Sequence, residues 1–220
     1  KLVAYLRRVL PRFSICTVVS ELERECVRKA VPGYDAVQVI PNAIDMTCYE
    51  GDFGIPQPNT LVFSGALTYT ANYDALSYFL SDIYPLILQT VPNVKLKVTG
   101  RTDGVDLNSF PNHPGVQYTG YVDDIRPVVA QSWVSVVPLR VGGGTRLKIL
   151  EAMALGTPVV STSKGAEGLE VINGENVLIA DEPSEFATRV SDLLVSTELR
   201  TRLVKGGLRL VKTRYNWRII

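Results

Sequence analysis

The chain has 220 residues, which at about 150 residues per domain corresponds to one domain and roughly half of another. Its 46% apolar and 20% charged residues are typical of a globular protein that buries a core, and they exclude an intrinsically disordered chain. We find no apolar run of the ~18 residues that a membrane span needs and no signal-peptide pattern. A single histidine excludes a histidine-rich metal site.

Three cysteines, without a CxxC pair, indicate reduced thiols and therefore a cytoplasmic protein. The net charge of +1 conceals an asymmetry. Residues 200–220 hold seven basic residues and no acidic one, whereas residues 1–199 hold 16 basic and 22 acidic residues. A body with that balance argues against nucleic acid as a partner.

Residues 1–45 are predicted to be the end of a Rossmann-like lobe whose beginning is absent. They contain two short apolar segments typical of buried strands and a helix between them; these are residues 13–19, 36–40 and 21–30. Ser20, with Glu23 three residues later, forms the capping-box pattern that predicts the start of this helix. Residues 46–59, rich in Pro, Asn, Asp and Gly, are predicted to link this piece to the next domain.

Residues 60–200 are predicted to form a complete α/β lobe, because strands and helices alternate along them. The predicted strands are residues 61–65, 94–100, 116–119, 134–139, 158–161 and 177–180. The predicted helices are the segment from Leu76 to Ile87, a short one before Trp133, and residues 145–155, 183–195 and 197–212. Pro85 is expected to kink or shorten the first helix. The predicted fold class is α/β, with a mostly parallel, doubly wound sheet and helices on both faces.

The strongest chemical signal is a turn between a buried strand and a helix. The turn consists of Gly142, Gly143, Gly144 and Thr145. Glycines let the backbone approach a ligand, and a helix N-terminus offers free N–H donors and a positive dipole end. Arg146 and Lys148 add two cations that oppose this dipole. A bound anion such as a diphosphate would reconcile the arrangement; the alternative is a turn whose basic residues are solvated.

Glu151 lies one to two turns into the same helix, where a carboxylate can bond the diol of a ribose. The alternative is an ion pair with Lys148, worth only ~0.2–0.5 kcal/mol at this spacing. The patterns GxxxxGK[ST] and GxGxxG are both absent, so a nucleotide site here would be of another type.

Several segments of the chain follow one another in a recognisable order. They are VIPNAID (39–45), FSG (63–65), VTG (98–100), VQYTGYV (116–122), LEAMALGTPVV (150–160), GAEGLE (165–170) and YNW (215–217). Together they resemble the retaining glycosyltransferases that have two Rossmann-like lobes, the GT-B fold, and family 4 in particular. The resemblance extends from about Phe13 to Trp217.

The resemblance implies that residues 60–200 bind a nucleoside-diphosphate sugar, while the other lobe binds the acceptor, which is a glycan, a lipid or a protein. Glu151 matches the glutamate that binds the ribose hydroxyls, and the turn Gly142–Thr145 matches the loop that approaches the sugar and the phosphates. Gly65 matches a strand end facing the donor, and Val122 lies where the base is bound. We expect no metal and no other cofactor, because cations and a helix terminus supply the positive charge.

The chain departs from this family in two ways. Gly143 stands where a second glutamate commonly lies, eight residues before Glu151. The usual Arg and Lys after the first strand of the lobe are missing from residues 65–72. We therefore expect Arg146 and Lys148 to neutralise the diphosphate and to act as the catalytic cations that stabilise the leaving group.

Other candidate residues carry weaker signals. Arg101 directly follows a strand end that, by the resemblance, faces the cleft between the two lobes. It is a further candidate contact for a phosphate or the base. His113 is expected in a surface loop without a catalytic role. Asp123 and Asp124 do not have the spacing of a DxD metal motif and are expected to cap a helix, as is Asn72.

Residues 201–220 are predicted to form a basic C-terminal helix that crosses back to the first lobe, as the last helix of this fold commonly does. The alternatives are a solvated helix face and peripheral contact with an anionic membrane through an amphipathic helix. Membrane contact would place the protein on the cytoplasmic face of that membrane.

The predicted function is that of a retaining glycosyltransferase of the hexosyltransferase type (EC 2.4), with the donor site on this chain. Without the rest of the acceptor lobe we expect the chain to bind a donor and to transfer little or nothing. An alternative of another class is a non-catalytic module that binds nucleotide sugars or a partner, which the two departures favour. A third alternative, a sugar-nucleotide epimerase of the same two-lobe architecture, would need more ionisable residues in the cleft between the lobes than this sequence offers.

Overall fold

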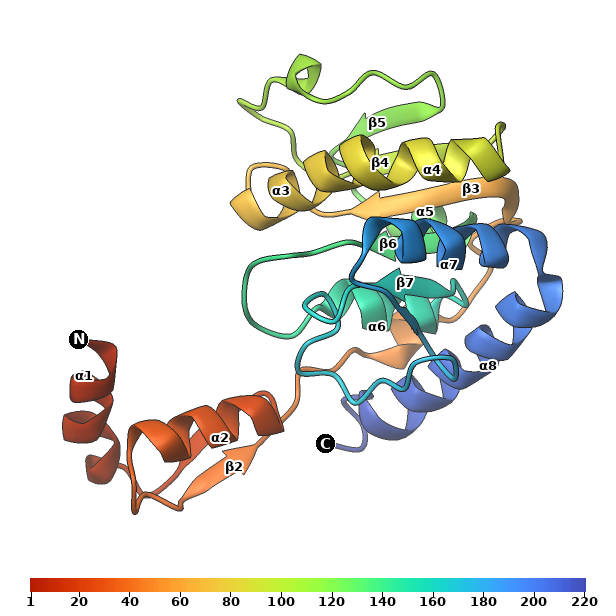
Figure 1. The fold of residues 1–220 in the computed structure, drawn as a ribbon. Helices are drawn as coiled ribbons and strands as arrows, with labels where there is room; N and C mark the ends of the chain where they lie inside the picture. The colour runs from red at the N-terminus through yellow and green to blue at the C-terminus, as the bar shows by residue number, and fades with distance from the viewer.

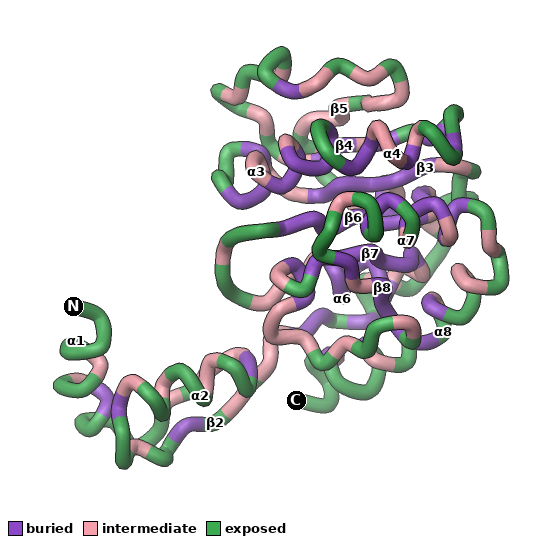
Figure 2. Tube along the Cα trace, viewed as in Figure 1, coloured by how far each residue is buried: buried purple, intermediate pink, exposed green.

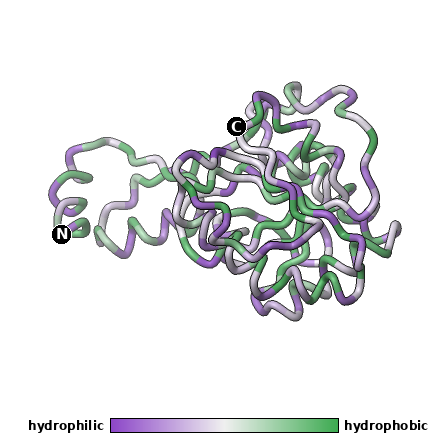
Figure 3. The backbone as a smooth tube through the Cα atoms, turned by 90° about the horizontal axis from the view of Figure 1, so that it is seen from above, coloured by the Kyte–Doolittle hydropathy of each residue, from purple (hydrophilic) through white to green (hydrophobic).

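The computed structural model describes residues 1–220 as a small body and a large body joined by a connection (Figure 1). The elements of the small body are α1 (Leu2–Val9), η1 (Leu10–Arg12), β1 (Cys16–Val18), α2 (Glu21–Ala30) and β2 (Val37–Val39). β1 and β2 pair in parallel. Seen from above, this body lies beside the large one (Figure 3), and most of its residues are exposed or half-buried (Figure 2). The predicted strand–helix–strand order is confirmed, with shorter strands than expected.

Helix α2 begins as predicted. Ser20 Oγ accepts a hydrogen bond from the Glu23 N–H (3.2 Å), and the Glu23 carboxylate accepts one from the Val19 N–H (3.0 Å). These bonds satisfy N–H groups that have no partner within the helix. Helix α1 begins without a side-chain cap.

The connection is ordered along its first part. Asp45 Oδ1 accepts hydrogen bonds from the N–H (3.0 Å) and the hydroxyl (2.7 Å) of Thr47, and these bonds start the short 3-10 helix η2 (Met46–Tyr49). Met46 is buried in the core of the large body. The predicted linker 46–59 is therefore partly structured. It includes a helical turn that docks on the large body through the buried Met46, and its last residues, from Gln57 on, belong to the first strand of that body.

The large body is built on a six-stranded sheet, all parallel, in the order β5-β4-β3-β6-β7-β8. Its strands are β3 (Gln57–Ser64), β4 (Lys95–Thr99), β5 (Val116–Gly120), β6 (Ser132–Val137), β7 (Val159–Ser161) and β8 (Leu178–Ile179). Its helices are α3 (Thr70–Tyr78), η3 (Phe79–Ile83), α4 (Tyr84–Thr90), η4 (Leu107–Ser109), α5 (Arg126–Ala130), α6 (Leu147–Ala154), α7 (Pro183–Val195) and α8 (Thr197–Arg214). α3, α4 and α7 lie on one face, and α6 lies on the other with α8 packed against it (Figure 1). The expected doubly wound α/β lobe is confirmed.

The buried core lies along the central strands (Figure 2). β6 and β7 are buried along nearly their whole length, because helices cover both faces of the sheet. Pro85 interrupts the long helix as predicted. It has no N–H to donate, and a π-helical turn, η3, separates α3 from α4 just before it.

The last helix starts at residue 197, as predicted for residues 197–212, so the expected limit at residue 201 is not the start of a separate helix. α8 begins at Thr197, where Ser196 Oγ accepts a hydrogen bond from the Leu199 N–H (3.1 Å). A division of the chain at residue 200 therefore falls inside one continuous helix, because the capping residue lies four residues upstream of it.

The segment after α8 contacts the connection. The Ile44 N–H donates to Tyr215 O (2.9 Å), and the Trp217 N–H donates to Ile44 O (3.1 Å). α8 itself packs against α6 and α7 of the large body. That the tail crosses back to the first lobe stays a prediction. None of the helices combines the length and the apolar character needed to cross a bilayer.

Candidate functional site

The predicted site residues gather at the carboxyl edge of the sheet, around the point where the strand order reverses. β3 and β6 are neighbours, but the chain leaves them toward opposite sides of the sheet, and ligands of such sheets bind at that point. Gly65 follows β3, Arg101 follows β4 and Val122 follows β5. The turn Gly142–Thr145 joins β6 to α6.

Lys148 connects the two sides of this reversal point. Its Nζ donates hydrogen bonds to Ser64 O and to Asn72 Oδ1 (3.0 Å). Asn72 Nδ2 in turn donates to Ala66 O (3.0 Å). A Cβ on Gly65 would lie 2.8 Å from Lys148 Nζ, so glycine at this strand end leaves the space that the ammonium group occupies.

The environment of Lys148 perturbs its proton affinity. Burial lowers the pKa of the ammonium group to about 8; the positive charge of Arg146 acts in the same direction and the carboxylate of Glu151 opposes it. The expectation that Asn72 caps a helix is wrong. Tyr69 is the N-cap residue of α3, and the Asn72 side chain is directed to Lys148 and to Ala66 O.

Arg146, the N-cap residue of α6, carries donors that the protein does not satisfy. Its Nη1 donates to Gly143 O, whereas its Nε and Nη2 are buried without a partner, as is Thr145 Oγ1. Three of the six such atoms in the structure therefore lie in two consecutive residues. An unsatisfied buried donor costs about 1–3 kcal/mol, and an anion beside the guanidinium group would remove that cost. The alternative of freely solvated basic residues is contradicted.

The guanidinium group of Arg146 lies against the glycine turn. A Cβ on Gly142 would lie 2.9 Å from Arg146 Nη2 and 3.6 Å from Tyr69 Oη. Gly142 and Gly144 have φ values of +101° and +79°, a region that favours glycine. The turn thus allows Arg146 to lie close to the start of α3 as well as α6, so two helix N-termini face the same space.

Glu151 is not paired with Lys148. Its Oε1 accepts a hydrogen bond from Tyr49 Oη (3.1 Å), which comes from η2 in the connection. The ion-pair alternative is therefore wrong, because the Lys148 ammonium group is directed to Ser64 and Asn72 instead.

Arg101 and Val122 lie farther along the same edge, beyond β4 and β5. The guanidinium carbon of Arg101 lies 5.4 Å from the centre of the Tyr121 ring, and both side chains are exposed. Val122 is half-buried beside them. An exposed aromatic ring and a cation next to each other offer a surface on which a planar base can stack.

Two weaker candidates have structural roles. His113 Nε2 lies 3.0 Å from Leu80 O, in a hydrogen bond with the backbone. Asp124 Oδ1 accepts a hydrogen bond from the N–H of Arg126 (2.9 Å), the first residue of α5, but the N-cap residue of this helix is Ile125, so neither Asp123 nor Asp124 occupies the predicted cap position. The Asp124 carboxylate also pairs with the Arg126 guanidinium group (2.8 and 2.9 Å), and the pair lowers the pKa of Asp124. No cluster of His, Cys, Asp or Glu side chains is arranged to hold a metal ion.

The small body faces the glycine turn across a cavity of about 170 Å³. It is lined by Ser20, Leu22, Glu23, Cys26, Gly143, Gly144, Thr145, Glu167 and Gly168. A Cβ on Gly168 would lie 3.4 Å from Ser20 Cβ, so the two bodies are in contact beside the turn. A ligand held by the turn would therefore lie at the boundary between them.

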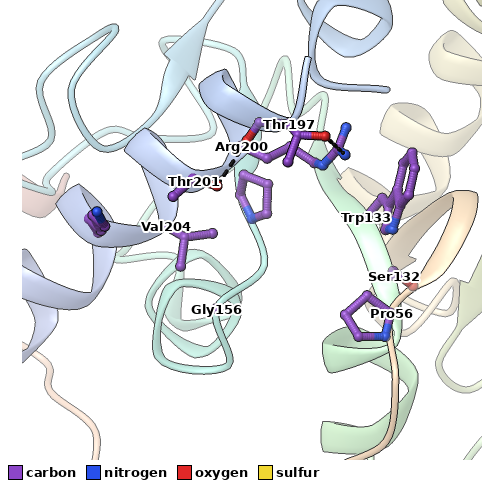
Figure 4. A pocket seen from close by; sticks show the side chains of 10 residues that line it. Pro56, Ser132, Trp133, Gly156, Thr197, Arg200, Thr201 and Val204 are labelled. Atoms are coloured by element: carbon purple, nitrogen blue, oxygen red, sulfur yellow. Dashed lines mark hydrogen bonds between the residues drawn. The ribbon is translucent and has the colours of Figure 1, made fainter. Parts of the chain in front are cut away.

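A second cavity, of about 390 Å³, lies at the opposite edge of the sheet (Figure 4). Its one guanidinium group, that of Arg200, lies 3.9 Å from the centre of the Trp133 ring. Arg200 also donates to Leu193 O, Leu194 O and Thr197 Oγ1. It holds the end of α7 and the start of α8, so this cavity does not offer the free donors found at the glycine turn.

Comparison with known protein families shows to which family the chain belongs. The sequence model described as "Glycosyl transferases group 1" matches residues 58–196. The chain belongs to this family. The matched range covers the six-stranded sheet, the glycine turn and α6, so the site described above lies within the family's domain.

Characterised relatives match over most of this chain. It is 29% identical over 214 residues to the phosphatidyl-myo-inositol mannosyltransferase of Mycobacterium leprae, covering 92% of this chain and 55% of that protein. It is 28% identical over 220 residues to one component of the human phosphatidylinositol N-acetylglucosaminyltransferase, covering 93% of this chain and 43% of that protein. The chain spans about half the length of the curated relatives it matches.

Solved structures share the fold. Anabaena Alr3699/HepE, in complex with UDP and glucose, superimposes with a TM-score of 0.75 at 16% identity, covering 97% of this chain and 63% of that one. Staphylococcus aureus TarM gives a TM-score of 0.80 at 14% identity, covering 96% and 43%. The large body is thus a Rossmann-like lobe of the GT-B type.

Proposed function

We propose that this chain supplies the donor site of a retaining glycosyltransferase of family 4, which transfers a sugar from a nucleoside-diphosphate sugar to an acceptor. The observation that carries the proposal is the pair of cations at the start of α6. Arg146 has two buried donors without a partner, and Lys148 is held beside it without a carboxylate. A diphosphate matches two adjacent cations and two helix N-termini.

The remaining residues supply the other contacts of such a donor. Glu151 binds the ribose hydroxyls, and the backbone of the turn Gly142–Thr145 approaches the sugar and the phosphates. Arg101 and Val122 flank the base. Negative charge develops on the departing diphosphate during transfer, so Arg146 and Lys148 stabilise the leaving group. The complex of Alr3699/HepE with UDP and glucose supports a nucleotide of this class.

The acceptor binds next to the small body. The cavity shared by α2 and the glycine turn supports this position, because the sugar end of the donor would lie there. Among glycan, lipid and protein acceptors, the names of the mycobacterial and human relatives favour a lipid with an inositol head group.

Calorimetric titration tests the donor site. We expect UDP or GDP, or a corresponding nucleotide sugar, to bind, and the nucleoside without phosphates to bind far more weakly, because the diphosphate makes the charged contacts. Failure of every nucleotide in the panel to bind would contradict the proposal. Binding without transfer by the longest form of the protein that can be prepared would favour the alternative, a non-catalytic nucleotide-sugar module.

The affinity for the nucleoside diphosphate is expected to fall as the pH rises above about 8. The Lys148 ammonium group has a pKa of about 8 in the free protein, and a bound diphosphate raises this pKa. At a pH between the pKa of the free form and that of the bound form, binding therefore takes up a proton. The loss is at most about tenfold per pH unit. The second phosphate ionisation, near pH ~6, lies below this range.

The Lys148→Met variant is the control for this pH dependence. It keeps an apolar chain of similar length but has no titrating group, so we expect weaker binding that no longer falls between pH 8 and pH 9.5. An equal fall in the variant and in the native protein would show that another group titrates.

A further inference from the structure

The Glu151 carboxylate has one hydrogen-bond partner in the structure, and that partner comes from the connection between the two bodies. Tyr49 Oη donates to Glu151 Oε1 across 3.1 Å. We propose that Tyr49 is a positioning residue, which orients the Glu151 carboxylate toward the ribose and so sets the preference for ribose over 2′-deoxyribose nucleotides. This inference rests on the proposed function, which assigns the ribose to Glu151.

The carboxylate depends on Tyr49 because the lysine on its own helix is engaged elsewhere. Lys148 lies one turn away on the same helix, yet its Nζ bonds to Ser64 O and Asn72 Oδ1. Without the Tyr49 bond, the side chain of Glu151 would be free to rotate between several orientations. With Oε1 held, Oε2 stays available to accept a hydroxyl of the ligand.

Tyr49 is well placed for this role because it is also held by contacts other than its bond to α6. The adjacent residue, Cys48, accepts a hydrogen bond at its carbonyl from Arg126, which is held by Asp124. Arg126 also lies 5.1 Å from the centre of the Phe53 ring. The backbone beside Tyr49 is therefore tied to α5, and the Tyr49 side chain packs against the hydrophobic core. A rigid donor restricts the carboxylate more than a mobile one would.

The hydroxyl remains a donor across the working pH range. Burial raises the pKa of Tyr49, and the negative charge of Glu151 together with their hydrogen bond raises it further. The phenol therefore stays protonated wherever the protein is folded near neutral pH, and the bond to Glu151 does not invert.

The test is a pair of titrations on the Tyr49→Phe variant, with UDP and 2′-deoxy-UDP as probes, or the guanine pair where GDP binds more tightly. Loss of the hydroxyl should weaken binding of the ribonucleotide by about three- to tenfold, as expected for part of a hydrogen bond to a charged group. Binding of the 2′-deoxy form should change little, so the ratio of the two dissociation constants falls.

Tyr84→Phe is the matched control. Tyr84 Oη donates to Val94 O (2.9 Å) at the far edge of the sheet, so this variant also loses one tyrosine hydrogen bond. We expect a comparable change in melting temperature but an unchanged ratio of ribose to 2′-deoxyribose affinity. A change of the ratio in both variants would overturn the assignment to Tyr49.

The Glu151→Ala background separates a failure of the role of Tyr49 from a failure of the assignment of the ribose to Glu151. If Tyr49 acts through Glu151, Tyr49→Phe should have no further effect on the ratio in that background. An unchanged ratio in Tyr49→Phe, with loss of the preference in Glu151→Ala, would overturn the role of Tyr49 and leave the donor site intact. Tighter ribonucleotide binding in Tyr49→Phe would show that the hydroxyl competes with the ribose. An unchanged preference in Glu151→Ala would overturn the ribose assignment and this inference with it.

Discussion

Replacing both Arg146 and Lys148 with alanine is expected to lower the affinity for a nucleoside diphosphate by about 10²- to 10⁴-fold. A hydrogen bond to a charged group contributes about 1.5–3 kcal/mol, so two such contacts together correspond to that range. Arg146 should contribute strongly, because two of its donors lack any protein partner. Isothermal titration with UDP and GDP measures the loss.

A variant with the same change of net charge elsewhere is the control for this experiment. Arg202 and Lys205 lie on α8, and both are exposed. Arg202→Ala/Lys205→Ala should bind the nucleotide as the native protein does, since exposed charges away from the site are screened by salt. Native affinity in the Arg146→Ala/Lys148→Ala variant, with an unchanged melting temperature, would show that these cations do not hold the diphosphate.

The parts of the fold that were predictable are those set by local chemistry. The Ser20 hydroxyl accepts a hydrogen bond from the Glu23 N–H, and the Glu23 carboxylate accepts one from the Val19 N–H. Because these bonds are local, the spacing of Ser20 and Glu23 alone predicts the start of α2. Pro85 lacks an N–H, and the break in the long helix follows from that fact. The alternation of strands and helices likewise predicts a parallel sheet, because parallel strands need crossover connections.

The partners of the site residues were not predictable, because they come from distant parts of the chain. Lys148 bonds to Asn72, 76 residues away, and Glu151 bonds to Tyr49, 102 residues away. Their residue types allowed local interpretations, a helix cap for Asn72 and an i,i+3 ion pair for Glu151. Both interpretations are wrong because the sheet brings the end of β3 and the connection beside α6. Tyr49 lies in the segment that joins the two bodies, and no sequence pattern around it indicates a role in the site.

The glycine at position 100 should be the residue least tolerant of a methyl group at the carboxyl edge of the sheet. Gly100 follows β4 with a φ of +138°, and a Cβ there would overlap the carbonyl group of Gly65 and lie 2.8 Å from the Ala66 nitrogen. These are backbone atoms, so a rotamer change cannot relieve the overlap. We expect Gly100→Ala to lower the free energy of unfolding by more than about 3 kcal/mol, since a positive φ and overpacking each cost about 1–3 kcal/mol. Urea unfolding measures this change.

Gly120→Ala is the control that introduces backbone strain at a positive φ without a close contact of the added Cβ. Gly120 ends the neighbouring strand with a φ of +68°, but a Cβ there would meet nothing within 4 Å, so we expect a loss of only about 1–2 kcal/mol. The Gly100 variant should also lose nucleotide affinity under conditions in which it remains folded. A shift of Gly65 moves the Ser64 carbonyl that holds Lys148, and a shift of Ala66 moves the carbonyl that holds Asn72. Equal destabilisation by the two alanine substitutions would mean that the strand ends of β3 and β4 can separate without cost, and the cation at the start of α6 would then not depend on their contact.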